Sequence, residues 1–219
     1  MSKSDYKCIL KGGAGEITEK KSRFIATVAP VSNEEEALAF IEEVRKANRT
    51  ARHNCYAYTI GRDPSLTRFS DDGEPSGTAG KPMLDVCINS GLHNMAVVVT
   101  RYFGGILLGT GGLVRAYTEA VKEGLANSAV ITKLYGRRLL IKSDYNALGK
   151  IRYLACERNI PLLGTEYADD VLTTVFVTPE NEKDFTEKLL DQTFGKAVIT
   201  PLENGYYAEY DGKSYLFED

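Results

Sequence analysis

The sequence predicts an α+β protein with two domains, and three observations support this class. Its 219 residues suffice for one large domain or two ordinary ones. Apolar residues make up 43% of the chain and charged residues 26%, which is typical of folded globular proteins. Strand-like and helix-like patterns alternate along the chain, and their order changes beyond residue 134. We therefore expect one domain over residues 1–134 and a second over residues 135–219.

The first domain mixes strand and helix signals. Alternating apolar residues in 17–31 indicate a strand, and Ser32 with Glu35 forms a capping box that begins a helix. Further strands are expected at 54–61, 67–70 and 96–99, with a turn at 62–65 and helices at 82–91 and 113–125. The run at 96–99 is apolar and mostly β-branched, which predicts a strand buried on both faces. The order indicates a two-layer α/β domain with helices on one face of a mixed sheet.

The second domain has a more regular order. Its expected elements are strands at 137–142, 162–167, 171–178 and 197–202 and helices at 145–158 and 181–193. This is the βαββαβ order of ferredoxin-like folds. In the tail at 205–217, tyrosines alternate around Asp211 and Gly212, which predicts a terminal β-hairpin.

A glycine-rich loop lies between the buried strand and the helix at 113–125. Backbone N–H groups at a helix start favour an anion, and arginine suits phosphate oxygens. We expect an anion or nucleic-acid site made of Arg101, Lys81, Arg115, Tyr102, Gly104, Gly105, Gly109, Gly111 and Gly112. An alternative stays open, in which the glycines form a tight corner and either arginine pairs with Asp71 or Glu74. The nucleotide-binding motifs GxxxxGK[ST] and GxGxxG are both absent.

An acidic loop precedes the helix at 82–91. Asp71, Asp72 and Glu74 could bind a hard cation, but the spacing of a calcium loop is absent, so we favour a solvated turn. The four cysteines and two histidines are scattered, which favours neither a disulfide framework nor a zinc site. We expect no bound metal and no cofactor.

Charge and hydropathy restrict the partners. The net charge is −3, which argues against a generally basic nucleic-acid binder. Residues 1–134 carry 17 Lys and Arg against 15 Asp and Glu, whereas residues 135–219 carry 10 against 15. Binding to a polyanion should therefore use the first domain. No apolar run reaches the ~20 residues of a membrane span, and the start of the chain lacks a signal-peptide core, so we expect a cytoplasmic protein without membrane contact.

Three segments resemble the YigZ/IMPACT family: SRFIA at 22–26, RFSDDGEPSGTAGKPML at 68–84, and GLHNMAVVVTRYFGGILLG at 91–109. The resemblance implies a first domain of the ribosomal-protein type, similar to domain IV of elongation factor G. It also implies a small ferredoxin-like second domain, similar to domain V of that factor. Eukaryotic family members regulate translation initiation by binding the activator of an initiation-factor kinase. No catalytic residue is carried over by the resemblance.

Two functions of different classes follow. The first is a non-enzymatic, regulatory binding protein linked to translation, with RNA, the ribosome or a translation factor as partner. The alternative is a phosphate- or nucleotide-binding enzyme that uses loop 104–112, with Asp71, Asp72 or Glu74 holding Mg²⁺ or acting as base. A third hypothesis is that the loop is only a folding element and that the interface lies elsewhere, for instance at the basic cluster at 45–52. We do not expect a small-molecule substrate.

Overall fold

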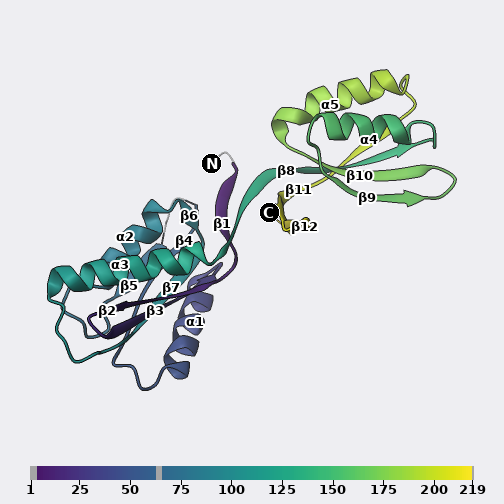
Figure 1. Ribbon diagram of the computed structural model, residues 1–219. Helices are drawn as coiled ribbons and strands as arrows, with labels where there is room; N and C mark the ends of the chain where they lie inside the picture. The colour runs from purple at the N-terminus through teal and green to yellow at the C-terminus, as the bar shows by residue number, and fades with distance from the viewer. Residues whose placement is uncertain (1–3, 63–65, 219) are drawn as a thin grey trace. The chain divides into compact units, whose positions relative to one another are not determined.

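The computed structural model describes residues 4–62 and 66–218, which form two compact units (Figure 1). The N-terminal unit spans Tyr6–Ile131, and the C-terminal unit comprises residues 132–218 with residues 4–5. The boundary that the sequence predicts, between residues 134 and 135, stays a prediction. The turn expected at 62–65 lies mostly outside the described residues. No described helix is long and apolar enough to span a bilayer.

The N-terminal unit is built on a five-stranded sheet in which each strand pairing is antiparallel. The strands follow the spatial order β2 (Ala14–Glu19), β3 (Ser22–Pro30), β7 (Met95–Tyr102), β4 (His53–Ile60) and β5 (Leu66–Ser70). The central strand β7 pairs with β3 from Pro30↔Met95 to Arg23↔Tyr102. Residues 95–99 of β7 are fully buried, which confirms the predicted buried strand.

Helices cover both faces of this sheet. Helix α1 (Glu34–Ala47) packs on Ala96 and Val98, whereas α2 (Gly80–Asn89) and α3 (Thr110–Ala126) pack on Val97 and Val99. The expectations of a mixed sheet and of helices on one face were therefore wrong. An uninterrupted apolar strand sends alternate side chains to opposite faces, so both faces need a cover.

Three local details of the N-terminal unit also differ from expectation. The strand expected at 17–31 is a hairpin of β2 and β3, whose turn places Lys20 and Lys21 at φ 46° and 66°. Two short strands, β1 (Tyr6–Lys11) and β6 (Leu92–His93), pair in parallel and were not expected. The α1 cap lies one residue later than expected, because the Asn33 side chain accepts from the Glu36 N–H. A Lys-Lys turn lacks the glycine or asparagine that normally signals a tight hairpin.

The C-terminal unit has the predicted ferredoxin-like order. Its elements are β8 (Ala129–Ser143, which begins before the unit boundary), α4 (Leu148–Glu157), β9 (Leu162–Tyr167), β10 (Val171–Val177), α5 (Pro179–Gln192), β11 (Val198–Tyr210) and β12 (Lys213–Glu218). The antiparallel strands lie in the order β9, β10, β8, β11, β12, and α4 and α5 bury their apolar sides in one core. The likeness to elongation factor G stays a prediction.

The predicted terminal hairpin is also present. Asp211 and Gly212 form its turn at φ 51° and 69°, between β11 and β12. The last ferredoxin strand and the first hairpin strand are one element, β11, with an irregularity between Pro201 and Asn204. The alternating tyrosines at 205–217 located the hairpin correctly, but they did not indicate that its first strand continues the last ferredoxin strand.

Candidate functional site

The glycine-rich loop is fixed at both ends. At its start, the Gly104 N–H donates to Ser22 Oγ at 3.1 Å, and a Cβ on Gly104 would lie 2.0 Å from the carbonyl carbon of Lys21. At its end, Gly109 at φ 73° precedes α3, and the Leu113 N–H donates to the Gly109 carbonyl at 3.0 Å. Because α3 begins at Thr110, the last two glycines lie in the first helical turn.

Arg101 points inward from the end of β7. Its Nη1 donates to Glu74 Oε1 at 2.6 Å, and the two side chains are only 7% and 3% exposed. The guanidinium also lies over the rings of Phe24 and Phe103, at 5.3 and 5.5 Å from their centroids. Because the Arg101 side chain is enclosed, it does not make the expected phosphate contact. It pairs instead with Glu74, which was the alternative expectation.

Tyr117 and Cys55 extend this buried polar group. The Tyr117 hydroxyl donates to Glu74 Oε1 at 2.9 Å, and the Cys55 thiol lies 3.3 Å from that hydroxyl and 2.9 Å from the Asp71 carbonyl oxygen. Burial raises the pKa of the Cys55 thiol and the pKa of the Tyr117 phenol above their usual ranges. Both groups stay protonated at neutral pH, so Cys55 is not an activated nucleophile.

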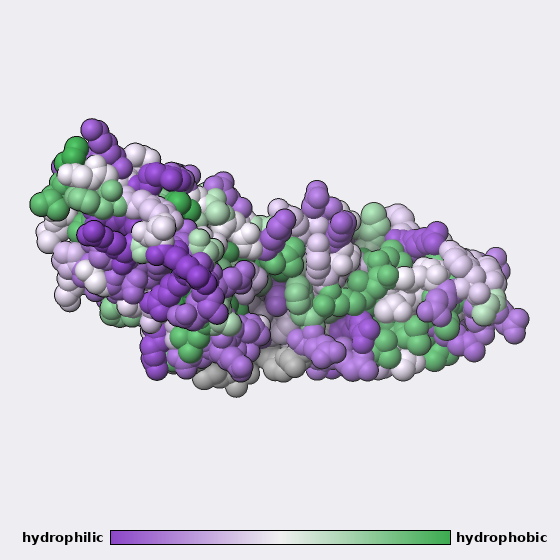
Figure 2. All heavy atoms as spheres, turned by 90° about the horizontal axis from the view of Figure 1, so that it is seen from below, coloured by the Kyte–Doolittle hydropathy of each residue, from purple (hydrophilic) through white to green (hydrophobic). Residues whose placement is uncertain are grey.

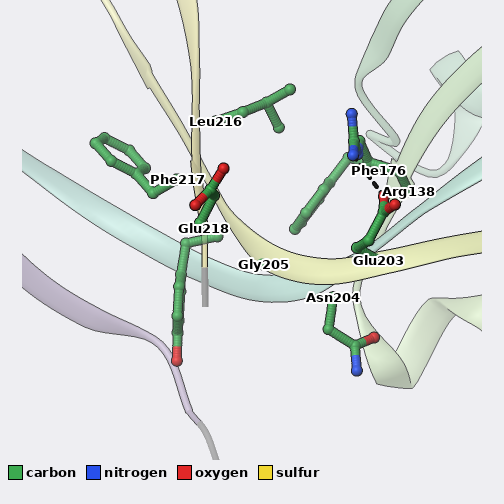
Figure 3. A pocket seen from close by; sticks show the side chains of 9 residues that line it. Arg138, Phe176, Glu203, Asn204, Gly205, Leu216, Phe217 and Glu218 are labelled. Carbon is green, nitrogen blue, oxygen red and sulfur yellow. Dashed lines mark hydrogen bonds and ion pairs between the residues drawn. The ribbon is translucent and has the colours of Figure 1, made fainter.

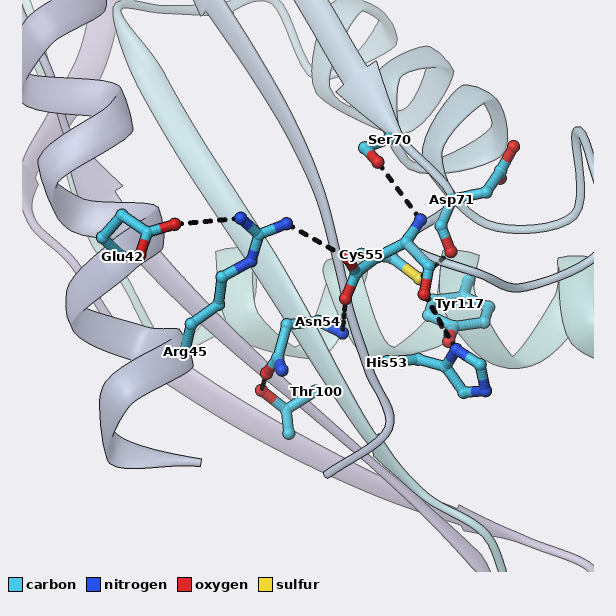
Figure 4. A network of polar contacts seen from close by, with 10 residues as sticks. Glu42, Arg45, His53, Asn54, Cys55, Ser70, Asp71, Thr100 and Tyr117 are labelled. Atoms are coloured by element: carbon cyan, nitrogen blue, oxygen red, sulfur yellow. Dashed lines mark hydrogen bonds and ion pairs between the residues drawn. The ribbon is translucent and has the colours of Figure 1, made fainter. Parts of the chain in front are cut away.

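Asp72 of the acidic loop is engaged as well, and Figure 4 shows its partners Arg45, Asn54 and His53. Asp72 accepts from the Asn54 N–H at 2.7 Å and pairs with Arg45 of α1 at 3.1 Å. The His53 ring lies 2.9 Å from the Asp72 carbonyl oxygen. The expected solvated turn is thus wrong for Glu74, which is buried, and Asp72 is tied to two other elements. Among the residues described, no group of three His, Cys, Asp or Glu side chains is placed to hold a metal ion.

Asp71 caps α2 from outside the helix. Its Oδ1 accepts from the N–H groups of Ala79 and Gly80 at 3.0 and 2.8 Å, and its Oδ2 accepts from the Gly77 N–H at 2.9 Å. These bonds satisfy amides that a helix start leaves without internal partners.

Replacing Asp71 with alanine should destabilise the N-terminal unit by about 1–2 kcal/mol, because the α2 start loses its acceptor. Chemical denaturation of the full chain checks this. The control is Asp85→Ala on the same helix, which removes an exposed pair with Lys81 and should cost less than about 0.5 kcal/mol. Equal effects of the two changes would show that Asp71 is no cap.

The middle of the loop is exposed and apolar. Phe103, Ile106 and Leu107 are 51%, 44% and 81% exposed. Figure 2 shows hydrophobic side chains at the end of the N-terminal unit where α3 begins, beside hydrophilic ones. Gly105, at φ 85°, and Gly111 have open space where a Cβ would stand. The loop is therefore a packed corner at Gly104 and an open structure beyond it.

The structure brings together only part of the expected anion site. The cap residue of α3 is Gly109, which has no side chain to accept from the amides of Gly111 and Gly112 in the first turn, and Arg115 is exposed one turn further on. Lys81 lies on α2 and pairs with Asp85, whereas the Tyr102 hydroxyl donates to Asn48 at 2.9 Å. Of the expected site, the amides of Gly111 and Gly112 and the Arg115 side chain thus lie on consecutive turns of one helix.

Sequence reasoning missed two features beside the loop. One is the exposed apolar tip, whose signal is the occurrence of Ile106 and Leu107 among glycines, where an ordinary phosphate loop is polar. The other is the turn at Lys20 and Lys21, which packs against Gly104. That contact joins residues about eighty positions apart and leaves no local signal.

Comparison with known proteins gives two family matches. The Impact N-terminal domain matches residues 20–125, and a domain of unknown function, DUF1949, matches residues 141–196. The protein called IMPACT family member YvyE from Bacillus subtilis is 41% identical, covering 92% of this chain and 93% of its own. IMPACT family member YigZ from Escherichia coli is 39% identical, covering 84% and 91%. A crystal structure described as that of a hypothetical protein is 35% identical, covers 92% of this chain and 99% of its own, and superposes with a TM-score of 0.59.

Proposed function

Because the chain belongs to the IMPACT family, we propose that it is a non-enzymatic, regulatory binding protein linked to translation, and that the segment 103–112 contacts its partner. The link to translation rests on the eukaryotic members of the family, which regulate translation initiation as described above. The N-terminal unit carries the contact, since it holds the loop, and the basic excess of the chain lies within residues 1–134.

The observation that carries this proposal is the exposed loop tip on a fixed base. Leu107 is 81% exposed, although the start of its loop is held by the buried pair of Arg101 and Glu74. Exposing a large apolar side chain on an ordered surface loop to water is unfavourable. The free energy falls when a partner covers that side chain. The rigid base reduces the conformational entropy that binding would otherwise cost.

The groups around the tip favour a partner with phosphates as well as apolar surface. The start of α3, whose cap residue Gly109 has no side chain, and the exposed Arg115 suit an anion. Lys20 and Lys21 are exposed on the turn that packs against Gly104. Naked RNA would satisfy the positive groups but not the aliphatic tip, whereas a ribosome presents RNA and protein together. We therefore propose the ribosome as the partner.

The test is co-sedimentation of the full chain with purified bacterial ribosomes. Leu107→Ser should weaken binding about tenfold, because a leucine that becomes buried contributes about 1.5–3 kcal/mol. The matched control is Phe194→Ser in the C-terminal unit, where the replaced side chain is 83% exposed and binding should not change. Arg115→Gln should reduce the salt dependence of binding by about one unit of slope.

Three results would count against this proposal. The first is an absence of co-sedimentation, and the second is an equal effect of Leu107→Ser and Phe194→Ser. The third is equally tight binding to protein-free ribosomal RNA that Leu107→Ser leaves unchanged, which would indicate a nucleic-acid contact alone.

The alternative of a nucleotide-binding enzyme has lost support. It required Asp71, Asp72 or Glu74 to hold Mg²⁺ or to act as base, and each carboxylate has partners inside the protein. The loop also carries aliphatic residues where a phosphate-binding loop needs polar ones.

A further inference from the structure

A hollow of about 580 Å³ lies in the C-terminal unit and is independent of the proposed function (Figure 3). Its apolar lining includes Phe176 of β10 and two successive residues of β12, Leu216 and Phe217, whose side chains leave the strand on opposite sides (Figure 3). Sites for small organic ligands commonly have volumes of about 300–1,000 Å³. The hollow is therefore large enough for such a molecule.

The apolar lining is preformed by the terminal hairpin. Tyr207 of β11 pairs in register with Leu216, and its ring stacks on Phe176 with centroids 5.4 Å apart. Gly205 lies so close to the opposite strand that a Cβ would be 2.6 Å from the Phe217 carbonyl oxygen. Phe176 is only 2% exposed, so its ring is held in place.

Among the residues that the structure describes, the charged groups of the hollow leave one negative charge without a partner. Arg138 Nη2 and Glu203 Oε2 are 2.6 Å apart and neutralise each other. The Glu218 carboxylate has no ion pair or side-chain hydrogen bond with any part of the chain that the structure describes. Figure 3 shows it beside the Leu216 and Phe217 side chains of the same strand. Lys133, which does not line the hollow, lies over the Phe217 ring at 3.7 Å.

We propose that this hollow binds a small organic cation, namely a protonated amine joined to an aromatic or aliphatic group. The apolar part would cover Leu216, which is 48% exposed, beside the enclosed Phe176 ring, and the ammonium group would pair with Glu218. An anion fits less well, because it would meet the Glu218 charge and would have to compete with Glu203 for Arg138.

The test uses three indole compounds of different charge: tryptamine, which is a cation, tryptophol, which is neutral, and indole-3-acetate, which is an anion. The chain has no tryptophan, so the fluorescence of the indole reports binding directly. Tryptamine should bind saturably and about tenfold more tightly than indole-3-acetate, with tryptophol between them. Absence of saturable tryptamine binding, or equal or tighter binding of indole-3-acetate, would overturn the proposal.

Variants locate the binding. Glu218→Gln should weaken tryptamine about threefold and leave tryptophol unchanged, since only the ion pair is lost. Leu216→Ala should weaken both compounds about fivefold through lost apolar contact. The control is Glu209→Gln, an exposed glutamate on β11 that does not line the hollow and should have no effect. Equal effects at positions 209 and 218 would place the binding elsewhere and refute the assignment.

Discussion

Replacing Glu74 with alanine is expected to lower the free energy of unfolding of the N-terminal unit by about 3–5 kcal/mol. The change would leave the Arg101 guanidinium, in a side chain only 7% exposed, without its carboxylate. The Tyr117 hydroxyl would lose its acceptor in the same step. Native-state hydrogen exchange of the β7 and α3 amides measures this loss, and the amides of the C-terminal unit provide an internal control.

A double replacement separates the cost of an unpaired charge from the value of the pair. Arg101→Met together with Glu74→Leu should be less destabilising than Glu74→Ala alone, because no buried charge is left uncompensated. If Glu74→Ala costs less than about 1 kcal/mol, Arg101 must reach water in the folded protein. The base of the loop would then not be fixed by this pair.

Gly104→Ala has the second largest expected effect, a loss of about 2–3 kcal/mol from the N-terminal unit. The new Cβ would stand 2.0 Å from the Lys21 carbonyl carbon, and backbone atoms cannot rotate away as a flexible side chain does. The loop must shift away from the β2–β3 turn, so ribosome binding should weaken together with stability. Thermal and chemical denaturation measure the first effect, and co-sedimentation measures the second.

The matched control is Gly111→Ala in the first turn of α3. Nothing lies within 4 Å of a Cβ there, and glycine disfavours a helix by up to about 1 kcal/mol relative to alanine. This variant should be as stable as the parent or slightly more so. Destabilisation of similar size at both positions would mean that any alanine harms the loop, irrespective of the contact with Lys21.

The sequence by itself determined the elements whose signals are local. The apolar run in β7 required burial on both faces, the βαββαβ order defined the C-terminal unit, and the Asp211-Gly212 pair located the last turn. These features follow from side-chain periodicity and turn chemistry within a few residues. The same local signals failed at the turn of Lys20 and Lys21, where the backbone is left-handed without the usual residues.

Only the tertiary structure decided the roles of the charged residues. Arg101 could have faced a ligand or an internal carboxylate, and it pairs with Glu74, 27 positions away in the sequence. Likewise Asp71 caps α2 and Asp72 joins β4 to α1, although all three acids read as one polar loop. Charge type is written in the sequence, but the partner depends on which segments pack together. Burial then decides the outcome, because an enclosed charge must find its partner inside the protein.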